Sequence, residues 1–161
     1  MYLSFPRNLV HPLTTLLPLG MWIGLLSISQ PALAQSRFER QVQRQLEDVA
    51  DLLDLDGQTM THEPYIDRLY EDEVDNLTLT LQGGRTYAII GVCDNDCHDL
   101  DFDLYDNDDN LLESDHADDD YPFVQITPAW TDTFTLNVIM YNCKTEPCYY
   151  GVGVFSDDGK Y

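Results

Sequence analysis

Acidic residues are concentrated in one segment of this 161-residue chain. Residues 92–120 contain 13 of its 29 Asp and Glu residues. Within this segment, residues 99–104 have the sequence DLDFDL, in which carboxylates and apolar side chains alternate. In an extended strand this alternation places three carboxylates on one face and three apolar side chains on the other. Neighbouring carboxylates on one face lie about 7 Å apart and repel each other, and a divalent cation would offset that repulsion.

Calcium is the cation that this pattern favours. It takes about six to eight oxygen ligands, including carboxylates, Asn amides and main-chain carbonyls. No Lys or Arg occurs from residue 86 to residue 143 to neutralise the carboxylates. The pattern is not an EF-hand loop, because Leu111 stands where that loop requires Gly. The alternative is a solvated acidic face that only keeps the protein soluble. The candidate calcium ligands are Asp94, Asp96, Asp99, Asp101, Asp106, Asp108, Asp118 and Asp119.

Residues that would catalyse a reaction form no recognisable arrangement. The sequence contains no G-x-S-x-G or H-E-x-x-H motif and no Cys/His nucleophile pattern. Two carboxylates would serve a glycosidase, yet a chain with 29 acidic residues offers such pairs by chance. A transition-metal site formed by His98, His116 and nearby Asp residues is a weaker alternative. We therefore expect a protein that is not an enzyme.

The charge of the chain limits the class of partner. Its formal net charge is −21 at pH 7. Such a surface repels nucleic acid and anionic lipid and attracts cations. Exposed tyrosines beside acids hold sugars in lectin-like surfaces, although tyrosines half-buried in strands are the commoner explanation for the Tyr-rich end of this chain. The expected partner is a protein or a polysaccharide.

The acidic segment lies within a series of predicted strands. From residue 65 onward apolar residues alternate with polar ones, and turn residues such as Gly83-Gly84 separate the runs. Short strands about ten residues apart are typical of a two-layer sandwich. We expect an all-β domain over residues 57–161, a jelly-roll-like β-sandwich of about eight strands, with residues 56–63 as a linker. The predicted strands are 65–70, 77–81, 86–93, 99–106, 111–114, 122–127, 133–141 and 149–155.

One amphipathic helix is predicted before this domain, within residues 35–56. Ser36 and Glu39 have the spacing of a capping box, in which each side chain bonds to the other residue's main-chain amide. An apolar stripe then extends over about five turns, from about residue 37 to residue 54. The stripe packs on the domain, or it pairs with a second copy and forms a homo-oligomer. The stripe consists of Phe38, Val42, Leu46, Val49 and Leu53.

The cysteines and the N-terminus both indicate export. Arg7 precedes an apolar run, and residues 32–34 form an A-x-A site, so residues 1–34 are predicted to be a signal peptide. The alternative is an uncleaved N-terminal anchor. We expect a secreted or periplasmic protein that meets the membrane only through this segment.

Four cysteines in an exported chain are expected to form disulfides. Their spacing favours two local bridges, one between Cys93 and Cys97 and one between Cys143 and Cys148. Crossed pairings, and a zinc site made of the four thiolates, are the alternatives.

The order of segments from Tyr87 to Phe155 resembles the bacterial pre-peptidase C-terminal domain family. The segments are DLDFDLYDNDDNLL, DDDYPFVQITPAWTDTFTLNV and YYGVGVF, which correspond to an Asp-x-Asp-apolar strand, a Pro-containing loop and a closing strand. The resemblance spans residues 61–161, and the chain departs from it at the usual turn glycine, where Asp109 or Asn110 stands. It implies a small jelly-roll sandwich and a non-catalytic module. It also implies that calcium or a polymeric substrate is among the ligands that related domains bind. The positions that match are Asp101, Asp103 and Leu104 in the first signature, and Thr133, Phe134, Leu136 and Val138 in the last.

These observations favour an exported, non-catalytic binding or interaction module that calcium stabilises through the Asp-rich strand and loops. The alternative is a structural envelope protein that oligomerises through its helix and has a passive acidic surface.

Overall fold

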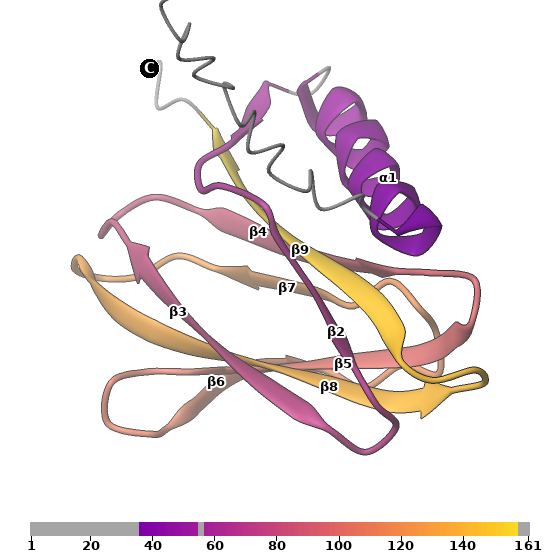
Figure 1. The fold of residues 1–161 in the computed structure, drawn as a ribbon. Coiled ribbons are helices and arrows are strands. Elements are labelled where there is room, and N and C mark those ends of the chain that lie inside the picture. Colours follow the sequence, from indigo (N-terminus) through magenta and orange to yellow (C-terminus); the bar gives the residue numbers. More distant parts are fainter. Residues whose placement is uncertain (1–35, 55–56, 158–161) are drawn as a thin grey trace, which may run out of the picture. The chain divides into compact units, whose positions relative to one another are not determined.

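The computed structural model describes residues 36–54 and 57–157, which form one helix and nine strands. The strands make two antiparallel sheets, as the sequence predicted for an all-β sandwich (Figure 1). The elements are α1 (Arg37–Asp54), β1 (Gln58–Met60), β2 (Tyr65–Leu69), β3 (Val74–Leu81), β4 (Tyr87–Cys93), β5 (Cys97–Tyr105), β6 (Leu111–Asp115), β7 (Phe123–Ile126), β8 (Asp132–Cys143) and β9 (Cys148–Asp157).

All eight predicted strands form, with shifts of up to three residues at their ends. In the first sheet β1 and β2 both pair with β9, which is followed by β4 and β7. The second sheet has the order β3-β8-β5-β6. The short strand β1 lies where the sequence predicted a linker, and it forms because Gln58–Met60 pairs with the end of β9.

The core lies between the two sheets and follows the alternation in the sequence. β5 contributes Leu100, Phe102 and Leu104, each at most 1 % exposed. Alternate residues of β3 and β8 meet these side chains from the same sheet, and the core residues of β4 and β9 meet them from the other sheet. Because the DLDFDL segment contributes all of its apolar side chains to the core, its carboxylates must project from the opposite face of β5.

Helix α1 packs on the outer face of the first sheet. Ser36 Oγ accepts the Glu39 amide at 3.0 Å, and Glu39 Oε2 accepts the Ser36 amide at 3.3 Å, so the predicted capping box is confirmed. Val42 and Leu46 are fully buried against the sheet, which stabilises the fold by about 1.5–3 kcal/mol for each side chain. Gly151 of β9 allows this close approach, since a Cβ there would lie 2.7 Å from Val42 Cγ1.

This packing confirms that the apolar stripe of α1 contacts its own domain. Phe38 and Val49, near the two ends of the stripe, are only partly buried. An oligomer that uses the same stripe would have to compete with this packing. The oligomer stays a prediction, to be tested by sedimentation.

Both local disulfides predicted from the spacing are present. Cys93 is bonded to Cys97 and Cys143 to Cys148, and no free cysteine remains. The crossed pairings and the zinc alternative are therefore wrong. Cys97 and Cys143 face each other as partners in the pairing of β5 with β8, so the two bridges lie at the same end of the second sheet.

In the described part of the chain, no helix combines the length and apolar character needed to span a bilayer. The expected signal peptide of residues 1–34 and its cleavage site lie outside the described residues.

Candidate functional site

Strand β5 positions the acidic residues that the sequence singled out. Asp99 and Asp101 are each only 7 % exposed. The alternative of a solvated acidic face is therefore wrong for these two residues. The reason is tertiary: the segment after β6 passes alongside β5, where the Leu100 amide donates to the Asp119 carbonyl at 3.0 Å.

The buried carboxylates of Asp99 and Asp101 lack partners. In each of them Oδ1 has no hydrogen-bond partner and no contact with solvent. An unsatisfied buried acceptor costs about 1–3 kcal/mol, and more when it is charged. The β5–β8 pairing also shifts register on both sides of Asp99, and such bulges occur often next to functional sites.

The pKa values reflect this environment. Burial raises the pKa of Asp101 to about 6, and the charge of Asp99 adds to the rise, whereas His116 opposes it. Burial also raises the pKa of Asp99, followed by the charges of Asp118 and Asp119 in the segment after β6. In both carboxyl groups the charged form is therefore less stable, relative to the neutral form, than in an exposed Asp.

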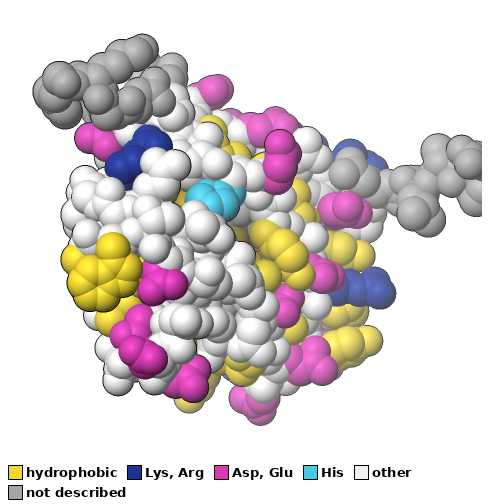
Figure 2. All heavy atoms as spheres, turned by 90° about the vertical axis from the view of Figure 1, so that its left-hand side faces the viewer, with side chains coloured by type: hydrophobic (Ala, Val, Ile, Leu, Met, Phe, Trp, Pro, Cys, Tyr) yellow, Lys and Arg dark blue, Asp and Glu magenta, His cyan; other side chains and the backbone are white. Residues whose placement is uncertain are grey.

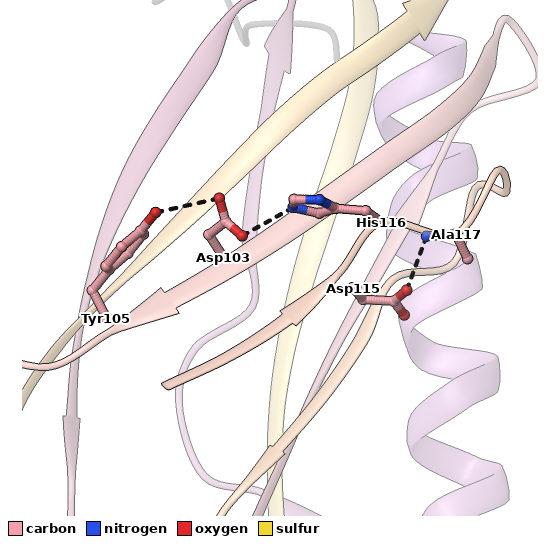
Figure 3. Close-up of polar contacts among 5 residues, drawn as sticks. All are labelled: Asp103, Tyr105, Asp115, His116 and Ala117. Atoms are coloured by element: carbon pink, nitrogen blue, oxygen red, sulfur yellow. Dashed lines mark hydrogen bonds and ion pairs between the residues drawn. The ribbon is translucent and has the colours of Figure 1, made fainter. Parts of the chain in front are cut away.

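His116 lies on that same segment, where its charge acts on Asp99 and Asp101 and its ring points toward Asp103 (Figure 3). Its Nε2 is 2.9 Å from Asp103 Oδ1, and Tyr105 donates its hydroxyl to Asp103 Oδ2 at 3.4 Å. Asp115 fixes the segment, because its two oxygens accept the amides of Ala117 and Phe123. The Asp103–His116 contact was not predicted from the sequence. The β5–β6 hairpin, in which Asp103 pairs with Ser114, brings the two residues together.

The pair of His116 and Asp103 is an imidazole oriented by a carboxylate, which is one part of a catalytic arrangement. A nucleophilic site needs a hydroxyl or thiol hydrogen-bonded to the imidazole. Within residues 36–54 and 57–157, the imidazole of His116 contacts Asp103 and no such group.

Two of the other candidate ligands, Asp94 and Asp106, lie apart from Asp99 and Asp101 and have partners of their own. Asp94 is buried, and its oxygens accept the amides of Tyr149 and Asp96, so it tethers the Cys93–Cys97 loop to β9. Asp106 Oδ1 accepts the amides of Asp108 and Asn110 in the β5–β6 turn. At about 3.3 Å per residue this turn begins about 20 Å from Asp99. The eight predicted ligands therefore form separate groups.

A complete metal centre is not assembled by side chains alone. Among the described residues, no three His, Cys, Asp or Glu side chains converge on one point. A cation at Asp99 and Asp101 would take its remaining ligands from main-chain carbonyls, water, or carboxylates that move toward it. Asp118 and Asp119 are the nearest candidates, because their charges act on Asp99.

No family model matches the chain. No curated protein matches it either. Among solved structures, it is similar to the pre-peptidase C-terminal domain of a collagenase from Bacillus anthracis, with a TM-score of 0.47 and 15 % sequence identity. The match covers 57 % of this chain and 87 % of that one. This structural neighbour bears the name of the family that the sequence resembles.

Proposed function

We propose that this protein is an exported, non-catalytic binding module whose strand β5 binds a calcium ion at Asp99 and Asp101. The observation that carries this proposal is the pair of buried carboxylates whose Oδ1 atoms have no partner. A cation beside them would supply the missing interaction and offset their mutual repulsion.

Calcium fits this donor set better than the other neutralising groups. No Lys or Arg is present from residue 86 to residue 143. His116 already contacts Asp103 and is 55 % exposed at its side chain. A proton neutralises Asp101 only below its pKa of about 6, and carboxylate and carbonyl oxygens are ligands that calcium accepts in variable geometry.

Export is supported by two features of the chain. Its two disulfides are typical of proteins from oxidising compartments. The N-terminal sequence has the order of a signal peptide. Extracellular calcium sites bind with dissociation constants of about 0.1–1 mM, so a site with few protein ligands would suffice there.

In this proposal the imidazole of His116 has no catalytic role. His116 is oriented by Asp103, as a general base would be, but the residues described place no nucleophile on it. We assign the Asp103–His116 contact a structural task, which is to hold the segment after β6 over β5.

Thermal melting of the full chain tests the calcium site. With EDTA and then with about 5 mM calcium, we expect the midpoint to rise by about 4 °C, which corresponds to about 1.4 kcal/mol at a tenfold excess over Kd. Asp99→Asn and Asp101→Asn should each abolish the rise, because each removes a charged ligand. Asp108→Asn is the matched control, since Asp108 is an exposed acid of the β5–β6 turn, and it should keep the rise.

Two outcomes would contradict this assignment. A wild-type midpoint that is the same in EDTA and in calcium removes the proposed ion. A rise with zinc that exceeds the rise with calcium, and that a His116→Ala substitution abolishes, moves the site to a transition metal held through the imidazole.

A further inference from the structure

A cleft opens between the edge strands of the two sheets, at the opposite end of β5 from Asp99. Its volume is about 490 Å³. It lies between β6 and β7 and extends to the connection between β7 and β8, residues 127–131. In Figure 1 this connection lies on the left, the side that faces the viewer in Figure 2. On that face exposed apolar side chains lie among acidic ones.

Trp130 lies at the rim of this cleft, and hydrogen bonds hold the main chain on both sides of it. It is 71 % exposed, more than any other large apolar side chain that the structure describes. The Gly84 amide donates to the Pro128 carbonyl at 2.7 Å, and the Gly83 amide donates to Thr131 Oγ1 at 3.1 Å. The β3–β4 turn therefore holds the main chain on both sides of Trp130.

The β3–β4 turn can approach the main chain of Trp130 closely because residue 83 is Gly. A Cβ at this position would lie 2.5 Å from the Trp130 Cα, so no larger residue fits without a shift of the main chain. Because the main chain is already held, a ligand that packs on the indole has to order only the two side-chain torsions of Trp130.

The lining of the cleft combines this indole with negative charge. Its carboxylates belong to Asp106, Asp108, Glu113 and Asp132, and no Lys or Arg lines it. Asp106 and Asp132 accept main-chain amides of their own segments. Asp108 and Glu113 are exposed, and the described part of the chain donates no hydrogen bond to the carboxylate of either.

We propose that this cleft binds a lysine or arginine side chain of a polypeptide partner. The cation would lie over the face of Trp130 and near the carboxylates of Asp108 and Glu113. The apolar part of the lining, which includes Leu112, Ile126 and Phe134, would contact the methylene groups of that side chain. The proposal rests on the proposed binding function, whose partner it specifies, but it does not require the calcium ion.

Charge complementarity favours this occupant over the alternatives. Phosphorylated or sulfated ligands would be repelled by four carboxylates. A neutral sugar would stack on the indole but would leave the carboxylates without an opposite charge. The net charge of −21 would also steer a basic partner toward the molecule.

The fluorescence of Trp130 tests the proposal. The chain has two Trp residues, so Trp22→Phe leaves Trp130 as the only one. We would titrate this full-length variant with lysine and arginine hexapeptides, a glutamate hexapeptide and cellohexaose. The expected result is a saturable change with the two basic peptides alone, with an affinity that falls severalfold as sodium chloride rises from about 0.05 to 0.3 M.

Substitutions separate this cleft from general attraction to an acidic surface. Asp108→Asn and Glu113→Gln should each lower the affinity by about threefold to tenfold. Asp67→Asn also removes one negative charge, but from β2, which lies at the edge of the first sheet opposite to β7. This variant should leave the affinity within about twofold. Trp130→Ala, followed with a labelled peptide, should lower it by about threefold or more.

The outcomes also separate this proposal from the calcium site. Peptide binding that is unchanged by Trp130→Ala and equally weakened by Asp67→Asn would show non-specific attraction and overturn the proposal. Saturable binding of cellohexaose without binding of the basic peptides would overturn it in favour of a sugar. Because the calcium site is measured by melting, its failure would leave a positive peptide titration intact.

Discussion

Two acidic regions of similar composition behave in opposite ways in this protein. On β5, burial raises the pKa of Asp99 and Asp101, and in each of them one oxygen has no partner. In the β5–β6 turn, hydrogen bonds from the Asn110 side chain and main chain lower the pKa of Asp106. The carboxylates of the strand are thus costly when charged, whereas the charged Asp106 stabilises its turn. The number of Asp residues in a segment therefore does not show whether the segment binds a cation. The hydrogen-bond donors around each carboxylate decide whether its charge is already stabilised.

The largest expected effect concerns the pH dependence of the strand carboxylates in calcium-free protein. Asp101 keeps its proton up to about pH 6 when folded but loses it near 3.8 when unfolded. The folded state therefore binds more protons in between, and the contribution of Asp101 to stability falls as pH rises through this range. The Asp101→Asn variant lacks this loss. Its free energy of unfolding should exceed that of the wild type by about 1–3 kcal/mol at pH 7, with little difference near pH 4.

Chemical denaturation of both proteins in EDTA between pH 4 and pH 7 measures this difference. Asp99, Asp103, Asp115 and His116 also act on Asp101, so the comparison must use the single substitution and not the absolute pH profile. A gap between the two proteins that stays constant across this range would show that Asp101 is not the titrating group.

The turn should respond with the opposite sign. Asp106→Ala removes the acceptor for the amides of Asp108 and Asn110, so we expect the protein to become less stable at pH 7. Because the pKa of Asp106 is lowered in the fold, its contribution is present above about pH 4 and is lost as pH falls below it. Denaturation of wild type and Asp106→Ala at pH 7 and pH 3 checks this, and a variant that is more stable at pH 7 would erase the contrast between the two regions.

The smallest expected effect is that of Asp108, the exposed acid in the same turn. Its carboxylate accepts no hydrogen bond from the residues that the structure describes. Asp108→Asn should therefore change the free energy of unfolding by less than about 0.5 kcal/mol. A larger loss in a denaturant titration would mean that Asp108 also supports the turn and is not available to a ligand of the neighbouring cleft.

Local patterns in the sequence were sufficient for most of the fold. Alternation within each run predicted eight strands, because an isolated strand already has two distinct faces. The Ser36–Glu39 capping box and the two short cysteine spacings also involve residues within a few positions of each other. β1 was missed because its pairing with β9 joins residues about 100 positions apart and leaves little trace in a segment of three residues.

The candidate site was predictable only in part. The sequence identified Asp99 and Asp101 as unusual, but it left open whether their face is solvated and grouped them with Asp94, Asp96, Asp106 and Asp108. Asp94 and Asp106 instead accept main-chain amides of neighbouring residues. Trp130 was not singled out, because an isolated Trp after Pro and Ala carries no pattern that distinguishes a buried indole from an exposed one.

By itself, the sequence determined that the DLDFDL segment is a strand with an apolar face and an acidic face, since the alternation of side chains is a local property of extended chain. Only the tertiary structure decided that the segment after β6 buries two of those carboxylates, while the β3–β4 turn supports the main chain beside the exposed Trp130. The physical reason is that burial depends on which distant segment covers a surface, and that choice is made by the packing of the whole chain.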